Sequence, residues 1–120
     1  MEDSREAALQ AAEACADKKA SQITVLDLRG ISLIADYFVI ANGNSTVQVR
    51  AVAEGVEEKL KAAGKELLRR EGHRDSRWLL LDFGDVVVHI FIDELRRFYD
   101  LERLWGDAVA VDWQTGRESR

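Results

Sequence analysis

Two runs of strand-forming residues, 78–83 and 86–91, are separated only by Gly84 and Asp85. A two-residue loop with glycine first is typical of a tight β-hairpin. The short loop also sets the register, and a slip of one residue would turn every side chain to the opposite face. The expected cross-strand pairs are Phe83 with Val86, Leu81 with Val88 and Leu79 with Ile90 on one face, and Asp82 with Val87, Leu80 with His89 and Trp78 with Phe91 on the other.

The two faces of this hairpin differ in character. The first is purely apolar and is expected in the core. The second combines the aromatic rings of Trp78 and Phe91 with Asp82 and His89. Aromatic area interleaved with polar groups is typical of a surface that binds a partner. The alternative is a face half covered by a helix, with Asp82 and His89 at its solvent-exposed edge.

The remaining segments predict an α/β domain with a mixed sheet. Apolar residues at helical spacing, β-branched runs and a strand–glycine turn–helix order all favour this class. Ser45 is expected to cap a helix, and Gly64 is expected to end that helix. The expected elements are a helix over 3–19, strands over 23–28, 37–41 and 67–71, a helix from Ser45 to Gly64, and the hairpin.

A last helical region is expected over residues 93–105, but its apolar side chains lie on two opposed arcs. Either the chain turns near Asp100, or one arc packs inward while the other meets a partner. Residues 1–107 are expected to form one domain, and residues 108–120 are expected to be a loosely ordered tail because they lack a sustained pattern.

The charge balance indicates the kind of partner. The chain has 22 acidic and 17 basic residues, a net charge of −5, and seven acidic against three basic residues fall within 82–107. This distribution favours a basic protein partner and argues against general binding to phosphate backbones or sequence-specific binding to nucleic acid. No apolar run reaches the ~20 residues that a membrane helix needs, so we expect a cytoplasmic protein with no membrane partner.

The sequence offers little for catalysis. Cys15 is the only cysteine, and with two well-separated histidines it has no recognisable zinc spacing. The turn at residues 43–45 has an anion-binding character, but helix capping alone explains it. Asp36 and Asp82 each lack the nearby second carboxylate that would hold magnesium. We expect no cofactor, no metal and no enzymatic activity; the rival is a nucleotidyltransferase-like enzyme using Ser45 and Asp82.

Three motifs follow one another along the chain: DYFVIA with GNS at 36–45, a tryptophan and DFGDVVVH at 78–89, and YDLERLW at 99–105. Together they closely resemble the ribosomal silencing factor family, also called Iojap-like. The resemblance covers residues 23–107. It implies a small mixed α/β sheet with helices, a nucleotidyltransferase-like fold that lacks the catalytic carboxylates.

The resemblance also implies a function. Members bind the large ribosomal subunit through its fourteenth protein, a basic protein at the subunit interface, and sterically stop the small subunit from joining. Translation is thereby damped when nutrients are short, as in stationary phase. A role in assembling the large subunit would use the same surface, and some members form homodimers. The family's contact surface carries over to Trp78, Asp82, His89 and Phe91 on the hairpin and to Tyr99, Leu101 and Glu102 on the last helix.

Overall fold

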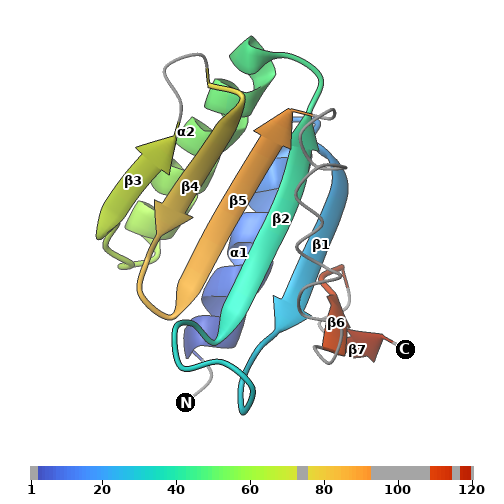
Figure 1. Cartoon of the computed structure of the whole chain (residues 1–120), viewed down its shortest axis with the longest axis vertical. Helices are drawn as coiled ribbons and strands as arrows, with labels where there is room; N and C mark the ends of the chain where they lie inside the picture. Colours follow the sequence, from blue (N-terminus) through green and yellow to red (C-terminus); the bar gives the residue numbers. More distant parts are fainter. Residues whose placement is uncertain (1–2, 73–75, 93–108, 115–116, 120) are drawn as a thin grey trace.

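The computed structural model describes residues 3–72, 76–92, 109–114 and 117–119. Within these residues the chain forms two helices and one seven-stranded sheet (Figure 1). The helices are α1 (Asp3–Asp17) and α2 (Thr46–Ala62), and the strands are β1 (Ser21–Asp27), β2 (Tyr37–Gly43), β3 (Arg69–Gly72), β4 (Trp78–Asp82), β5 (Val86–Ile92), β6 (Val109–Asp112) and β7 (Arg117–Ser119).

The sheet is mixed, which confirms the expected fold class. Its strand order is β3-β4-β5-β2-β1-β6-β7. The central strands β2 and β5 run parallel to each other, and every other neighbouring pair is antiparallel. Because α2 and the strands β3 and β4 lie between β2 and β5 in sequence, they form the long connection that a parallel pair requires.

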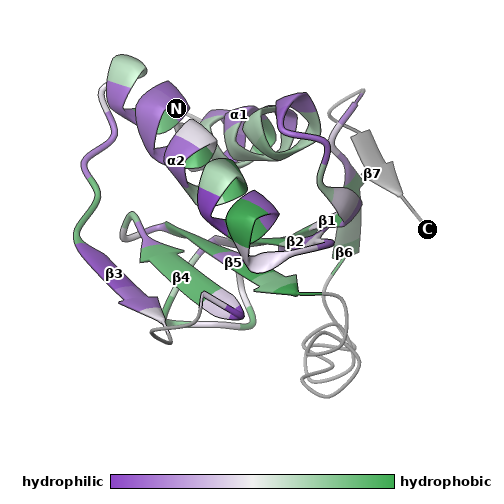
Figure 2. Ribbon diagram, turned by 90° about the horizontal axis from the view of Figure 1, so that it is seen from above, coloured by the Kyte–Doolittle hydropathy of each residue, from purple (hydrophilic) through white to green (hydrophobic). Residues whose placement is uncertain are grey.

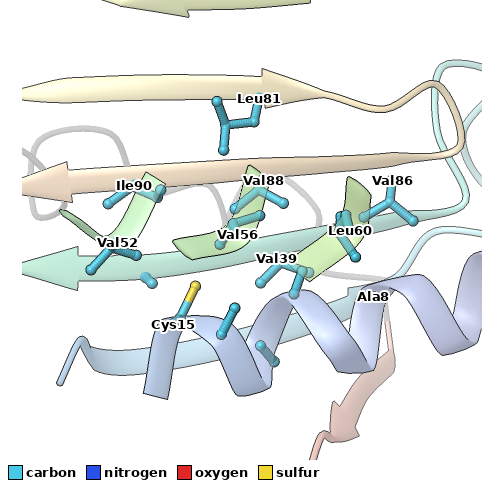
Figure 3. Packing of buried hydrophobic residues seen from close by; sticks show 14 of the residues in the cluster. Ala8, Cys15, Val39, Val52, Val56, Leu60, Leu81, Val86, Val88 and Ile90 are labelled. Carbon is cyan, nitrogen blue, oxygen red and sulfur yellow. The ribbon is translucent and has the colours of Figure 1, made fainter. Parts of the chain in front are cut away.

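Both helices cover the same side of the sheet (Figure 2). The alanines of α1 allow that helix to lie close to the strands, while α2 contributes larger aliphatic side chains such as Val56 and Leu60 (Figure 3). Cys15 is fully buried among them, as expected of a small core residue. Burial raises the pKa of its thiol to about 12, so it is a poor nucleophile. Neither described helix is long and apolar enough to span a membrane.

The two ends of α2 are formed as the sequence predicts. The Oγ of Ser45 accepts a hydrogen bond from the Gln48 N–H at 3.1 Å, which satisfies one of the free amides of the first turn. At the other end, Gly64 has a φ of +85°, and the Lys65 N–H donates to the Leu60 carbonyl at 2.8 Å. This left-handed glycine followed by a backward hydrogen bond terminates the helix.

The β4–β5 hairpin has the predicted register. The five pairs from Trp78–Phe91 to Asp82–Val87 are all present, and the Phe83 N–H donates to the Val86 carbonyl at 2.9 Å. Gly84 has a φ of +93°, which explains why glycine stands first in the turn. The short strand expected over 67–71 is present as β3, which pairs with β4.

The C-terminal segment differs from the expected loose tail. Strand β6 pairs with β1 and with β7, and the side chain of Val111 is buried against the helix-facing core. A four-residue strand is too short to produce a clear alternating pattern, which is why the sequence alone does not reveal it. The helix expected over residues 93–105 lies outside the described residues.

The junction between β2 and α2 depends on Gly43. A methyl group at this position would lie 2.8 Å from Cγ2 of Val49, closer than real side chains approach one another. We therefore expect Gly43→Ala to lower the free energy of unfolding by about 2 to 3 kcal/mol, as overpacked sites do. Urea denaturation measures this loss.

Gly30→Ala is the matched control, because Gly30 has open space around it and a φ of +86°. The substitution there should cost only the left-handed strain of about 1 kcal/mol. An equal or smaller loss in Gly43→Ala would contradict the steric explanation.

Candidate partner-binding site

The side of the sheet opposite the helices carries a second apolar cluster. Most of its members are alternate residues of β1, β2, β4 and β5, whose other side chains point toward the helices. Its side chains are mostly large, and several are aromatic. The buried members are Leu26, Leu28, Ala35, Phe38, Ile40, Val87 and Phe91, with Trp78, Leu80 and Ala110 partly buried against them.

Four rings form the centre of this cluster, which we call the aromatic cluster: Phe38, Trp78, His89 and Phe91. The ring centroids of Trp78 and Phe91 lie 5.8 Å apart, and those of His89 and Phe91 lie 6.2 Å apart; the planes in each pair are within 4° of parallel. Phe38 meets His89 at 4.7 Å with its plane turned by 61°. These are the offset and edge-to-face geometries that aromatic rings favour.

The predicted hairpin residues Trp78, Asp82, His89 and Phe91 do share one face of the sheet. However, they are not equally accessible. Trp78 is half-buried, whereas Phe91 is only 1% exposed and His89 only 6%. The expectation that His89 lies at a solvent-exposed edge is therefore wrong, and so is the expectation that His89 and Phe91 both face outward. The hairpin pattern does not include the apolar side chains that β1 and β2 add to the same face.

Asp82 already has partners within the protein. One carboxylate oxygen accepts the Gly84 N–H at 2.8 Å, and the other lies 3.7 Å from a guanidinium nitrogen of Arg69. The carboxylate therefore stabilises the hairpin turn and pairs with the neighbouring strand β3. The sequence gives no sign of this pairing, because Arg69 stands thirteen positions before Asp82.

His89 is buried without hydrogen bonds. Neither ring nitrogen has a partner within the described part of the chain, and the residues paired with it across the strands, Leu80 and Ile40, are aliphatic. Burial lowers the pKa of His89 from 6.5 to about 4, because the charged ring would lose its hydration. The imidazole is therefore neutral at physiological pH. A histidine in a strand is most often held in place by hydrogen bonds within the fold, but this environment does not fit that role.

The last-helix residues of the predicted surface, Tyr99, Leu101 and Glu102, lie outside the described residues. Conversely, sequence reasoning missed two residues on the side of the sheet that carries the aromatic cluster, which we call the aromatic face. Leu80 is partly buried beside the cluster, and its predicted pairing with His89 could have identified it. Phe38 comes from a strand that is apolar on both sides, so its sequence pattern does not indicate which face it takes.

The turn at residues 43–45, the best candidate for anion binding, is occupied by the protein itself. The side-chain oxygen of Gln48 accepts the Asn44 N–H at 2.6 Å. The amide nitrogen of the same side chain donates to the carbonyls of Lys18 and Lys19. Gln48 thus ties this turn to the end of α1. In the described ranges, no group of three or more His, Cys, Asp or Glu side chains could hold a metal ion.

The burial of His89 makes folding sensitive to acid. The stabilisation that comes from keeping the ring neutral is complete above pH 6.5 and is lost as the pH falls toward 4, because the unfolded chain takes up the proton first. Through this residue, the free energy of unfolding should fall by about 2 kcal/mol between neutral pH and about pH 5. Urea titrations of the wild type and of His89→Leu measure the difference; equal acid losses in both would contradict it.

Comparisons with known proteins agree on the family. The family model described as "Ribosomal silencing factor during starvation" matches residues 1–120. The ribosomal silencing factor of Bacillus subtilis is 48% identical over 106 residues, which are 88% of this chain and 90% of that protein. The chloroplastic protein Iojap of maize is 34% identical over 108 residues, which are 88% of this chain and 46% of that protein.

A solved structure of a protein from Chromobacterium violaceum superposes with a TM-score of 0.83 at 40% sequence identity. The alignment covers 88% of each chain. The family model and the curated relatives therefore lead to the same assignment as the three motifs: this chain belongs to the ribosomal silencing factor family.

Proposed function

We propose that this protein is a translational repressor of the bacterial type, which binds the large ribosomal subunit and sterically blocks joining of the small subunit. Its direct partner on the large subunit is the fourteenth ribosomal protein, a basic protein at the subunit interface. The repressor acts without catalysis and without a cofactor. Membership of a family described by silencing of ribosomes during starvation supports this function.

The observation that carries the proposal is the aromatic face. On the side of the sheet opposite α1 and α2, side chains of this size form a packed apolar cluster, and its β4 members Trp78 and Leu80 remain partly exposed. Partly exposed aromatic anchors supported by a packed layer are typical of binding hot spots. The net charge of −5 suits a basic partner and should accelerate association.

The size of the protein supports an occlusion mechanism. Its principal extents are 35 × 31 × 25 Å. Atoms of two ribosomal subunits must approach to within about 4 Å to form direct contacts. A body with a smallest extent of 25 Å at the interface would keep these surfaces apart, so binding alone suffices for repression.

Trp78 is expected to be an anchor of the interface. Trp78→Ala should weaken binding to purified large subunits by about 2 kcal/mol, or roughly 30-fold in Kd, because it removes a large aromatic group from the docking face. Cosedimentation at low and moderate salt measures the affinity, with circular dichroism as the check on folding.

Val47→Ala is the control for this substitution. Val47 is an exposed apolar residue on α2, on the opposite side of the sheet, so its truncation should leave the affinity unchanged. Equal affinities for Trp78→Ala and the wild type would remove Trp78 from the interface. Failure of the wild type to cosediment with large subunits at either salt concentration would overturn the proposed function.

Tyr99 is expected to act as a second anchor, on the evidence of its motif alone. Tyr99→Ala should lose at least ~2 kcal/mol of binding energy in the same assay while the protein remains folded. Retention of full affinity would exclude this residue from the site. Glu102, as a charge at the rim, should chiefly change the association rate and its salt dependence.

Two outcomes would redirect the assignment. Binding to immature but not to mature large subunits would favour an assembly factor that uses the same surface. Magnesium-dependent binding of a nucleotide would revive the enzymatic alternative at Ser45 and Asp82.

A further inference from the structure

Hydrophobic packing alone does not explain His89 in the aromatic cluster. A buried polar group normally has a hydrogen-bond partner, and one without a partner destabilises the fold. Here both ring nitrogens lack one within the described residues, although only 6% of the residue's surface is exposed. A leucine or phenylalanine would fill the same space without this penalty. The imidazole therefore calls for a role that a hydrocarbon could not perform.

The described surroundings of His89 contain no charge that could stabilise a protonated ring. On the same face, β2 contributes an amide and two apolar groups, β5 contributes two apolar groups, and β4 contributes two apolar groups and one carboxylate. That carboxylate, on Asp82, is one pair of residues further along the hairpin and is held by Arg69 and the Gly84 N–H. The residues concerned are Phe38, Ile40 and Asn42 on β2, Val87 and Phe91 on β5, and Trp78, Leu80 and Asp82 on β4.

We propose that His89 makes the aromatic face proton-sensitive: protonation of its ring separates the aromatic cluster and disrupts the surface that docks on the ribosome. The proposal rests on the proposed function for the identity of the docking face. A protonated imidazole has two N–H donors and a charge, and within the described residues the closed cluster gives neither ring nitrogen a hydrogen-bond acceptor. The ring must therefore move toward water, and the neighbouring rings of Trp78 and Phe91 lose their parallel contacts.

The size of the effect follows from the protonation equilibria. In the closed face burial holds the pKa of His89 at about 4, whereas an exposed ring titrates at 6.5. Between about pH 7.5 and 5.5, the ratio of open to closed faces should therefore rise about tenfold. The affinity for the large subunit should fall by up to this factor, depending on how much of the face is open at neutral pH.

Side-chain NMR from about pH 7.5 to 4 tests the opening without a ribosome. We expect the ring signals of Trp78 and Phe91 to change with the same midpoint as the imidazole of His89. Methyl signals of Val52 and Val56 on α2, which belong to the helix-facing core, should not change at that midpoint. In His89→Leu the low-pH change at Trp78 should be absent, and His89→Phe serves if the leucine variant does not fold.

Three results would overturn the proposal. The first is titration of His89 only when the helix-facing core is lost as well, which would make its protonation a consequence of global unfolding. The second is an equal response of Trp78 to acid in the wild type and in His89→Leu. The third is protonation of His89 while the ring signals of Trp78 and Phe91 stay unchanged.

Cosedimentation with large subunits then tests the coupling to docking. For each protein, the quantity compared is the ratio of Kd at about pH 5.5 to Kd at about pH 7.5. This ratio should be several-fold larger, at most about tenfold, for the wild type than for His89→Leu. Acid effects on the ribosome itself cancel in this comparison because they are the same for both proteins. Equal ratios would overturn the coupling. Absence of binding at the higher pH would instead refute the proposed function, and the NMR measurement would still decide whether the face opens.

Discussion

The parallel pairing of β2 with β5 is the interaction on which the rest of the structure depends. All seven residues of β2 are buried, and seven cross-strand pairs join it to β5. One side of this pair supports both helices, and the other supports the aromatic cluster. A shift of one residue between the two strands would exchange the valines beneath α2 for His89 and Phe91, so the helix-facing core and the aromatic cluster are specified by the same register.

The hairpin and the ends of α2 were predictable from sequence because each depends on local chemistry. Gly84 permits the tight turn, the alternating residues specify the register, and Ser45 and Gly64 satisfy the backbone at the helix ends. The strand order required information from distant parts of the chain. The position of β6 beside β1, in particular, depends on the packing of a few apolar side chains, such as Val111, against the edge of the core.

For the hairpin residues of the candidate site, the shared face of the sheet was predictable from sequence but the environment of each side chain was not. Alternation along the hairpin correctly assigns Trp78, Asp82, His89 and Phe91 to one face. It does not reveal whether that face is covered, since burial depends on what the other strands contribute. For the same reason, one of the two sequence interpretations placed Asp82 and His89 at a solvent-exposed edge, whereas the fold has an ion pair at Asp82 and a buried, neutral imidazole at His89.

A subunit-joining experiment tests the central claim of occlusion most directly. Purified large subunits are first saturated with the protein, small subunits are then added, and the fraction of joined ribosomes is measured by sedimentation together with the protein bound to each species. The account predicts that joined ribosomes decrease in proportion to the occupancy of large subunits and that none carries the protein. Joined ribosomes that form normally with the protein still bound would contradict it.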